Sequence, residues 1–436
     1  MHKGGDRDDI NNYRPISILP LFSKIFERIM YNQLYNFLEK YEILNPDQFG
    51  FRKNRSTIEA VLNQLEYIYT NLEQNKTVIS IFLDFKKAFD CIDHKILLRK
   101  LFFYGIRGLP FEWFRSYLSN RTQFVDINGI ISPPKTVTHG VPQGSVLGPL
   151  LFLIFINDFP NTNTFFKFCM FADDSTLTCK FDRSNETFIC QNLERELQPI
   201  HNWLIMNKIK INYSKSKFII FSYGKVYDLN AITFGNSCIE STDYTKFLGL
   251  FVDKNLNFKT HVDYISRKLS RIVGMLFRLN DILPTSILRT LYLTLFVPHI
   301  FYGIEIWYGI LMTNNDRVFR LQKKAIRAVN KLPYNTHTNE YFKSMHLMKL
   351  DDMYKQQVLC YMFKSCLARD KNSNIHDYPT RIRNNLVIPR FHRAKTQATI
   401  FYRGVILWND LDLEMRSKRD VKCFKNSLKK KLILQY

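Results

Sequence analysis

The stretch "KFCMFADDSTLTCKF", residues 167–181, places two neighbouring carboxylates between two short apolar runs. Apolar residues alternate on both sides of the tetrapeptide Ala-Asp-Asp-Ser, which predicts a β-hairpin with Asp173 and Asp174 in its tip. Two unit charges about 4 Å apart repel each other by about 1 kcal/mol in water, and by several times that near a protein surface. Because Asp is also common in solvated turns, the hairpin alone leaves both a solvated turn and a cation site open.

The composition is that of a large, folded, basic chain. The 436 residues are 46% hydrophobic and 15% aromatic, which excludes a disordered protein and suits several subdomains. Lys and Arg number 62 against 39 Asp and Glu, a net charge of +23. Such a surplus favours a polyanionic partner, nucleic acid first and an anionic membrane second. The segment from Lys331 to the end carries about half of it, +12.

Neither cysteine spacing nor hydropathy points to zinc, secretion or a membrane. The eight cysteines form no CxxC pair and no finger-like spacing, so a reduced intracellular compartment is the simplest interpretation. The opening "MHKGGDRDDINN" is too polar for a signal peptide. The run from Leu291 to Met312 is long enough to span a bilayer, but Pro298, His299 and Glu305 interrupt it. We expect a buried pair of helices there.

Helical and strand patterns alternate up to about Lys254. Apolar positions at helical spacing, Ile25 and Ile29 among them, predict a helix in "ISILPLFSKIFERIMYNQLYNFLEKYEIL". The run "TVISIFLDF" is apolar almost throughout, as expected of a strand buried on both faces. Further helices are predicted in "STIEAVLNQLEYIYTNLEQN", "KKAFDCIDHKILLRKLFFYGI", "GPLLFLIFINDF" and "FICQNLERELQPIHNWLIMNKI", and a strand in "KFIIFSYG". Beyond Lys254 the pattern is almost wholly helical, so we expect an α+β body and an α-rich remainder that meet near Asn255.

A third carboxylate joins the pair in the hairpin. Asp84 ends the strand run, where a side chain points to the rim of a sheet, whereas Asp90 and Asp93 fall inside the expected helix and are expected to be solvated. Three carboxylates without a histidine suit Mg²⁺, which takes oxygen ligands together with phosphates and waters, and disfavour zinc hydrolysis. Two such ions about 4 Å apart can activate a hydroxyl and stabilise a leaving oxygen in phosphoryl transfer.

Seven segments in a fixed order resemble the reverse transcriptases of non-LTR (LINE-type) retrotransposons, in particular the jockey and CR1-like branches. They are "NNYRPISIL", "QFGFRKNRST", "FLDFKKAFDCIDH", "HGVPQGSVLGPLLF", "FADD", "NYSKSK" and "FLGL". The resemblance spans residues 11–250 and continues through "PHIFYGIEIWYG" and "LQKKAIRAV" before it fades after about residue 340. It implies an enzyme, an RNA-directed DNA polymerase that extends a DNA primer on an RNA template with dNTPs and releases pyrophosphate.

The resemblance also implies a fold and a division of the chain. The fold is an α+β right-hand polymerase with a helical C-terminal region. The implied domains are fingers at residues 1–75, a palm with an inserted fingers segment at 76–254, a helical thumb at 255–335 and a basic C-terminal region at 336–436. The surplus of +12 in the last quarter of the chain leads us to expect that residues 340–436 bind template RNA or target DNA.

Individual residues match motif positions of the family. Asp84, Asp173 and Asp174, with the carbonyl of Phe85, match the ligands of two Mg²⁺ ions, for which Mn²⁺ is a substitute. Phe89 matches the steric gate that excludes a ribose 2′-OH, although a core Phe on a helix is the alternative. Gln143 and Gly144 match the pair that lines the nucleotide pocket, although a turn without function is the alternative. Lys3 and Arg14 match residues that contact the triphosphate, and Arg52 and Arg55 either do the same or lie in a solvated loop. Lys215 matches the proton donor to the leaving pyrophosphate, and the primer grip is matched by Phe247, Leu248 and Gly249.

Other family features are not seen in this sequence. Ser216 stands where the family usually has Thr, and no endonuclease, N-terminal template-binding extension or cysteine-rich knuckle is recognisable. We interpret the chain as the polymerase portion of an element, either a degenerate copy or a shortened gene product. A catalytically inactive, nucleic-acid-binding remnant is the alternative function. The family's habit of priming at chromosomal nicks implies action in the nucleus after synthesis in the cytoplasm, without a membrane partner.

Overall fold

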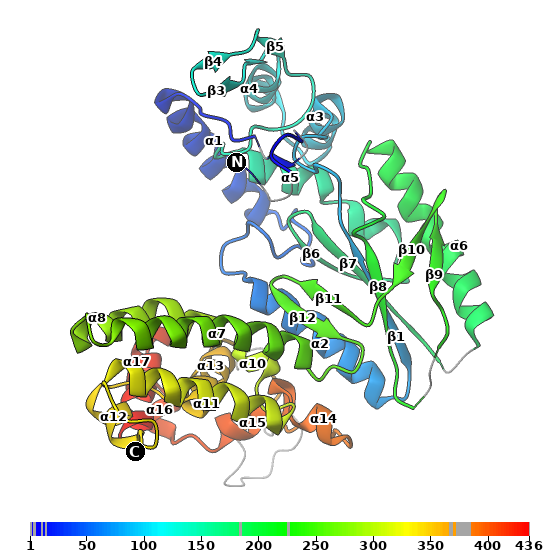
Figure 1. Ribbon diagram of the computed structural model, residues 1–436. Coiled ribbons are helices and arrows are strands. Elements are labelled where there is room, and N and C mark those ends of the chain that lie inside the picture. Colours follow the sequence, from blue (N-terminus) through cyan, green and yellow to red (C-terminus); the bar gives the residue numbers. More distant parts are fainter. Residues whose placement is uncertain are drawn as a thin grey trace. The chain divides into compact units, whose positions relative to one another are not determined.

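The computed structural model describes residues 2, 6–9, 12–13, 15–182, 185–224, 227–365, 369–371 and 385–435, and the chain divides into two compact units (Figure 1). The first unit consists of Met1–Leu65 and Asn75–Thr242, the second of Glu66–Gln74 and Asp243–Tyr436. The finer division into fingers, palm, thumb and C-terminal region stays a prediction.

A six-stranded sheet forms the centre of the first unit, in the strand order β6-β7-β1-β8-β10-β9. All neighbouring pairs are antiparallel except β8 and β10, which are parallel. The strands are β1 (Thr77–Leu83), β6 (Lys167–Phe171), β7 (Asp174–Phe181), β8 (Lys217–Phe221), β9 (Ala231–Phe234) and β10 (Ser237–Ser241). The predicted hairpin, the doubly buried strand and the strand in "KFIIFSYG" are thereby confirmed.

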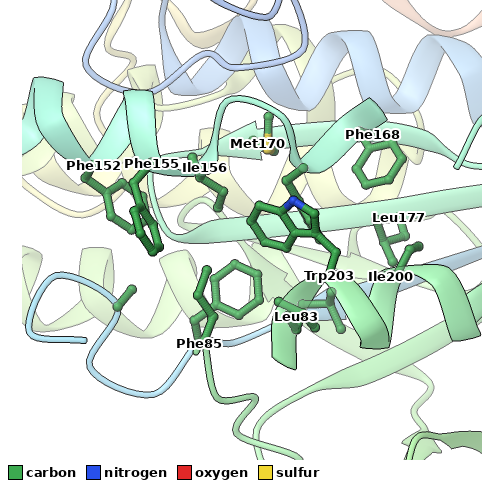
Figure 2. Packing of buried hydrophobic residues seen from close by; sticks show 14 of the residues in the cluster. Leu83, Phe85, Phe152, Phe155, Ile156, Phe168, Met170, Leu177, Ile200 and Trp203 are labelled. Carbon is green, nitrogen blue, oxygen red and sulfur yellow. The ribbon is translucent and has the colours of Figure 1, made fainter. Parts of the chain in front are cut away.

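Helices pack against this sheet and complete its core. They are α1 (Leu21–Lys40), α2 (Thr57–Glu73), α3 (His94–Phe103), α4 (Gly108–Leu118), α5 (Gly148–Ile156), the 3₁₀ helix η2 (Phe159–Thr162) and α6 (Glu186–Met206). Helix α5 is apolar on all sides and wholly buried, and α6 packs on β9 and η2 (Figure 1). Figure 2 shows how Phe85, Phe152, Phe168 and Trp203 from four different elements gather in one apolar cluster.

An exposed segment between α4 and α5 in the sequence holds two small two-stranded sheets, the inner one a hairpin enclosed by the outer strand pair. Its strands are β2 (Thr122–Gln123), β3 (Asp126–Ile127), β4 (Ile130–Ile131) and β5 (Lys135–Thr136). The strand β2 pairs with β5 and β3 with β4. These short strands were not expected from the sequence, because two residues are too few to show an alternating pattern.

The second unit is mainly helical. It contains a hairpin of β11 (Tyr244–Phe247) and β12 (Leu250–Asp253), followed by α7 (Lys259–Leu279), α8 (Thr285–Leu291), the π-helix η3 (Tyr292–Phe296), α9 (Val297–Phe301), α10 (Ile304–Trp307), α11 (Met312–Val329), α12 (Asn339–Ser344), α13 (Leu350–Ser365), α14 (Ala394–Gln397), α15 (Ile400–Asn409), α16 (Leu413–Arg416) and α17 (Val421–Ile433). The helices α7 and α11 lie side by side (Figure 1). The apolar run at 291–312 therefore forms several short segments and not a pair of helices.

No helix in the described part of the chain is long and apolar enough to cross a membrane.

Helix α1 buries Leu34 and Leu38 as their helical spacing predicts, but its first half buries a different face from the one that its apolar residues predict. Ile25 and Ile29 are exposed, whereas the carboxylate of Glu27 is buried. The Glu27 oxygens accept hydrogen bonds from the Val146 N–H at 2.6 Å and from the Tyr117 hydroxyl at 2.8 Å. Because a buried carboxylate is stable only when such donors reach it, these partners turn Glu27 inward and leave the two isoleucines in solvent.

Candidate active site

The register of two strands brings the predicted carboxylates to one edge of the sheet. Strand β1 runs antiparallel to β7, and Leu83 pairs with Ser175. Asp84, the next residue after β1, therefore stands opposite Asp174, the first residue of β7. Asp173 immediately precedes it in the turn. Residues that are 89 and 90 positions apart in the chain thus meet at the end of one strand pair.

The hairpin turn is tighter than the tetrapeptide tip that the sequence suggests. Phe171 pairs with Asp174, so only Ala172 and Asp173 lie outside the strands. Ala172 has φ +57°, in the left-handed region that a residue with a Cβ atom rarely adopts. Two-residue hairpin turns require positive φ in this place because their twist then matches that of the strands. The tight turn makes Asp174 a strand residue with a fixed direction.

The three carboxylates interact electrostatically. The pKa of Asp174 is raised to about 6, first by its partial removal from water and then by the negative charges of Asp173 and Asp84. Its side chain nevertheless remains accessible to solvent. The oxygen donors of these three carboxylates are of the kind that suits a hard divalent cation. Within the described ranges, however, no three His, Cys, Asp or Glu side chains are drawn together as closely as the ligands of one ion.

The segment before β8 holds the main chain of Asp84. The Ser216 hydroxyl accepts a hydrogen bond from the Asp84 N–H at 3.1 Å, and the Asn212 N–H donates to the Asp84 carbonyl at 2.8 Å. Ser216 is fully buried, and Lys215 beside it is exposed. Sequence reasoning missed this contact of Ser216. Because Ser and Thr both carry a hydroxyl at this position, the departure from the family pattern preserves the hydrogen bond.

Phe85 and Phe89 both contact the apolar core. The ring of Phe85 is buried and meets Phe159 edge-on, with centroids 6.0 Å apart. Phe89 is half-buried and stacks on Phe152 of α5 at 4.6 Å. It lies in a series of turns and not in a helix, because α3 begins only at His94. The expected helix after Asp84 thus starts about eight residues later than its apolar pattern suggested.

Two carboxylates that we expected to be solvated have specific partners. Asp90 accepts a hydrogen bond from the Gln143 side chain at 2.7 Å. Asp93 is buried and caps α3 by accepting the N–H groups of the first turn, and Lys208 donates to it at 2.6 Å. Burial opposes ionisation of Asp93, but these donors outweigh it and hold its pKa below the ordinary value. Both expectations were wrong: Gln143 and Lys208 come from distant segments, and the capping role of Asp93 was hidden by the assumption that it lies inside a helix and not before one.

The Gln143–Gly144 turn lies against the segment that contains Phe89. The Val141 N–H donates to the Phe89 carbonyl at 3.0 Å. Gly144 has φ +112°, and a Cβ atom there would come within 3.1 Å of the Ser17 carbonyl oxygen. The Ser17 N–H in turn donates to the Gln143 carbonyl at 2.8 Å. The structure therefore brings Phe89, Gln143 and Gly144 together, with a glycine where space and conformation both require one.

The candidate basic residues are placed less uniformly. Lys3 and Arg14 lie outside the described residues. The guanidinium of Arg52 pairs with Glu39 at 3.2 Å and donates to a main-chain carbonyl, which gives it a structural role. The Arg55 guanidinium forms an ion pair at 3.2 Å with the carboxylate of Glu59, four residues further along the chain.

The predicted primer grip is the turn between β11 and β12, in the second unit. Phe247 is buried, and Leu248 and Gly249 both have positive φ, +44° and +88°. The Tyr302 hydroxyl donates to the Leu248 carbonyl at 2.5 Å. A Cβ atom on Gly249 would lie 2.9 Å from the Tyr302 ring, so glycine is needed for this close contact as well as for its conformation.

Replacing Asp174 by Asn should stabilise the metal-free protein at neutral pH. The folded-state pKa of about 6 exceeds the ordinary value of 3.8, so the folded chain is penalised when Asp174 ionises above pH 6, and the penalty disappears as the pH falls through this range. In buffer that contains a metal chelator, Asp174→Asn should raise the melting temperature of the protein at pH 7.5 and leave it nearly unchanged at pH 4. Asp182→Asn, at the far end of β7, is the control. A lower melting temperature at pH 7.5 would contradict this electrostatic account.

Comparisons with known proteins identify the family. Residues 1–252 match the family described as reverse transcriptase (RNA-dependent DNA polymerase). The chain is 30% identical over 381 residues to the probable RNA-directed DNA polymerase from transposon BS of Drosophila melanogaster, covering 81% of this chain and 41% of that protein. It is 27% identical over 378 residues to the polymerase from mobile element jockey of the same species, covering 83% and 40%. The chain thus spans about two fifths of the length of these relatives.

Among solved structures, telomerase from Candida tropicalis in complex with a fragment of telomeric RNA aligns with 74% of this chain and 47% of its own, at 13% identity and a TM-score of 0.38, a likeness too weak to carry an argument. The family match alone spans more than half of the chain. It confirms the resemblance found in the seven motifs and, with the α+β unit described above, the expected polymerase fold class. The chain therefore belongs to the reverse transcriptase family, whose enzymes generally use divalent metal ions.

Proposed function

We propose that this chain is the RNA-directed DNA polymerase of a non-LTR retrotransposon, which joins a dNTP to the 3′-OH of a DNA primer on an RNA template and releases pyrophosphate. One observation carries the proposal: in a chain of this family, Asp84 and Asp174 face each other across β1 and β7, with Asp173 beside them. Oxygen ligands of this kind suit two Mg²⁺ ions, with the Phe85 carbonyl as a further ligand.

The chain's own residues have distinct tasks in this reaction. When bound, such ions supply Lewis-acid stabilisation of the attacking and leaving oxygens. The three carboxylates hold the positive charge at the sheet edge and thereby draw the triphosphate towards the primer end. Lys215, exposed in the segment that fixes Asp84, is our candidate for the group that protonates the leaving pyrophosphate. An ammonium group is suitable because it presents three donors on a flexible stem.

We further propose that Phe89, Gln143 and Gly144 line the dNTP pocket. The stacking of Phe89 on Phe152 holds the ring in place, and a ring that cannot move aside excludes a ribose 2′-OH by contact. The bond from Gln143 to Asp90 orients the Gln143 amide. Lys3 and Arg14 are proposed triphosphate contacts, and Phe247, Leu248 and Gly249 the primer grip, from the motif positions alone. Action in the nucleus after synthesis in the cytoplasm rests likewise on the family resemblance.

A primer-extension assay tests the function directly. The purified chain should extend oligo(dT) on poly(rA) with dTTP and Mg²⁺, and the double substitution Asp173→Asn/Asp174→Asn should abolish extension while duplex binding persists, because it removes metal ligands and no phosphate contact. Asp182→Asn is the control. Binding without extension by the unaltered chain would instead identify a nucleic-acid-binding remnant, the alternative that the +23 charge supports.

Sugar selection tests the role of Phe89. Phe89→Ala should admit ribonucleotides and retain dTTP incorporation, because it opens space at the 2′ position. The measurement is the ratio of kcat/KM for dTTP and UTP, which should fall by at least about tenfold, or 1.4 kcal/mol. Phe159→Ala, which removes a buried ring of the same core that packs on Phe85, controls for lost packing. If both substitutions changed the ratio equally, Phe89 would be a core residue only.

Exposed lysines of α17 test the proposed nucleic-acid contact of the C-terminal region. Deletion of this region would expose core residues, since Trp408 and Phe424 are buried there. Charge neutralisation is therefore the cleaner change, and the target is the exposed set Lys422, Lys425, Lys429 and Lys430. Substitution by Gln should weaken duplex binding and reduce the slope of log K against log[salt] by about 0.9 for each lysine that contacts a phosphate.

A set of ion-paired lysines in the second unit provides the matched control. Their substitution changes the net charge equally, but each has a carboxylate partner within 2.9 Å: Lys254, Lys355, Lys418 and Lys431. Equal effects of both sets would mean that only total charge matters, and no effect of the α17 set would refute the proposed contact.

A further inference from the structure

The segment Asp47–Gly50 runs alongside the end of β6. The Met170 N–H donates to the Asp47 carbonyl at 2.9 Å, and the Phe49 N–H donates to the Met170 carbonyl at 2.8 Å. Gln48 and Met170 therefore form a parallel bridge at the edge of the six-stranded sheet. This brings a segment that is more than 100 residues away in the chain to the strand that leads into the turn with Asp173.

The side chain of Gln48 bonds to the turn itself. Its Oε1 atom accepts hydrogen bonds from the Gly50 N–H at 2.8 Å and from the Ala172 N–H at 3.0 Å. Gln48 is only 2% exposed, so water does not compete for these bonds. Because only the oxygen of an amide can accept, two N–H donors on one atom also fix which way the group faces.

The bonded residue is the strained one. Ala172 has φ +57°, a left-handed conformation that is unfavourable for a residue with a Cβ atom. Strain of this kind persists only where the surroundings hold it. The next two residues are Asp173 and Asp174, so relaxation at Ala172 would redirect the carboxylates.

Gly50 makes the contact sterically feasible. A Cβ atom on Gly50 would lie 2.3 Å from the Ala172 nitrogen and 2.9 Å from the Phe171 carbonyl carbon, distances that no real side chain tolerates. Its φ is not in the positive range, so the requirement is for space and not for conformation. The next residue, Phe51, meets the Phe89 ring edge-on at 6.1 Å. One short segment thus contacts both the carboxylate turn and the proposed gate.

We propose that Gln48 is a positioning residue of the active site, whose side-chain oxygen holds the strained Ala172 turn so that Asp173 and Asp174 face Asp84 correctly for a divalent cation. The inference rests on the proposed polymerase function. Groups that fix metal ligands from behind typically contribute 10–100-fold to metal affinity or activity. Gln48 acts here through the main chain, since it bonds to an N–H group and not to a carboxylate.

Gln48→Met is the decisive variant, because it keeps the length of the side chain and removes the acceptor. Gln64→Met is the matched control. Gln64 is equally buried, at 2%, and its amide contacts the same sheet through Ser80 and Thr178, away from the turn. Gln48→Glu keeps an acceptor oxygen and serves as a second variant should Gln48→Met fold poorly.

Two readouts do not depend on catalysis. Hydrogen exchange of the peptides covering residues 168–176 should be about five- to tenfold faster in Gln48→Met, the amount that the loss of one hydrogen bond implies. In Gln48→Glu these peptides should exchange at the same rate as in the unaltered chain. The affinity for Mn²⁺, measured by electron paramagnetic resonance, should fall about 10-fold or more in Gln48→Met. Gln64→Met should leave both quantities unchanged, whatever its effect on the melting temperature.

Primer extension provides the third readout. In Gln48→Met, kcat should fall about 10- to 100-fold with KM for dTTP within a factor of two, because the fault lies in the metal ligands and not in the nucleotide pocket. Unchanged exchange at the turn, or the same increase in Gln64→Met, would overturn the proposal. If the unaltered chain showed no extension, the polymerase function would fail, while exchange and Mn²⁺ binding would still decide the role of Gln48.

Discussion

The antiparallel register of β1 and β7 is the constraint on which the site depends. It pairs Leu83 with Ser175 and so puts Asp84 opposite Asp174. A slip by one residue would turn every side chain of one strand to the other face of the sheet. Both strands are buried almost throughout, so such a slip would separate Ser80 from Thr178, whose buried hydroxyls are hydrogen-bonded to each other, and place apolar side chains beside them. The hydrophobic core of Figure 2 therefore determines the placement of three charged groups that are not part of it.

The hydrogen bonds that support this edge of the sheet go to main-chain atoms. Ser216 accepts from the N–H of Asp84, and Gln48 accepts from the N–H of Ala172. Neither donates to a carboxylate, and neither reduces the repulsion that raises the pKa of Asp174. Such hydrogen bonds fix the main chain of the ligand residues and leave their carboxylate oxygens available to a cation. A cation that binds there meets carboxylates already gathered, and its charge relieves a repulsion that packing and main-chain bonds maintain.

The sequence predicted what short-range patterns encode. The doubly buried strand, the hairpin and Asp84 at a strand end all follow from runs of a few residues, and the structure has them where expected. Some errors concern element boundaries, such as the start of α3, and others concern contacts between distant segments. From the sequence alone Asp90 and Asp93 are expected to be solvated, whereas in the structure Gln143 donates a hydrogen bond to Asp90 and Lys208 donates one to Asp93. Gln48 looks like an ordinary polar residue between Asp47 and Phe49, and no local pattern indicates that its oxygen reaches a turn beyond residue 170.

In a polymerase site of this kind, the negative charges of the carboxylates repel the negatively charged substrate, so positive charge elsewhere in the chain has to offset this repulsion. Three carboxylates at one edge repel a polyanionic substrate, and a bound cation counteracts this only at contact distance. Charges further away are screened within about 8 Å at physiological ionic strength, so attraction must come from basic residues spread along the path of the nucleic acid. The surplus of +23, distributed over the chain and increased in its last quarter, meets that requirement. In the proposed polymerase, the acidic centre and the basic surplus would thus serve one function: the basic residues would retain the polyanion, and the centre would attract it only through a bound cation.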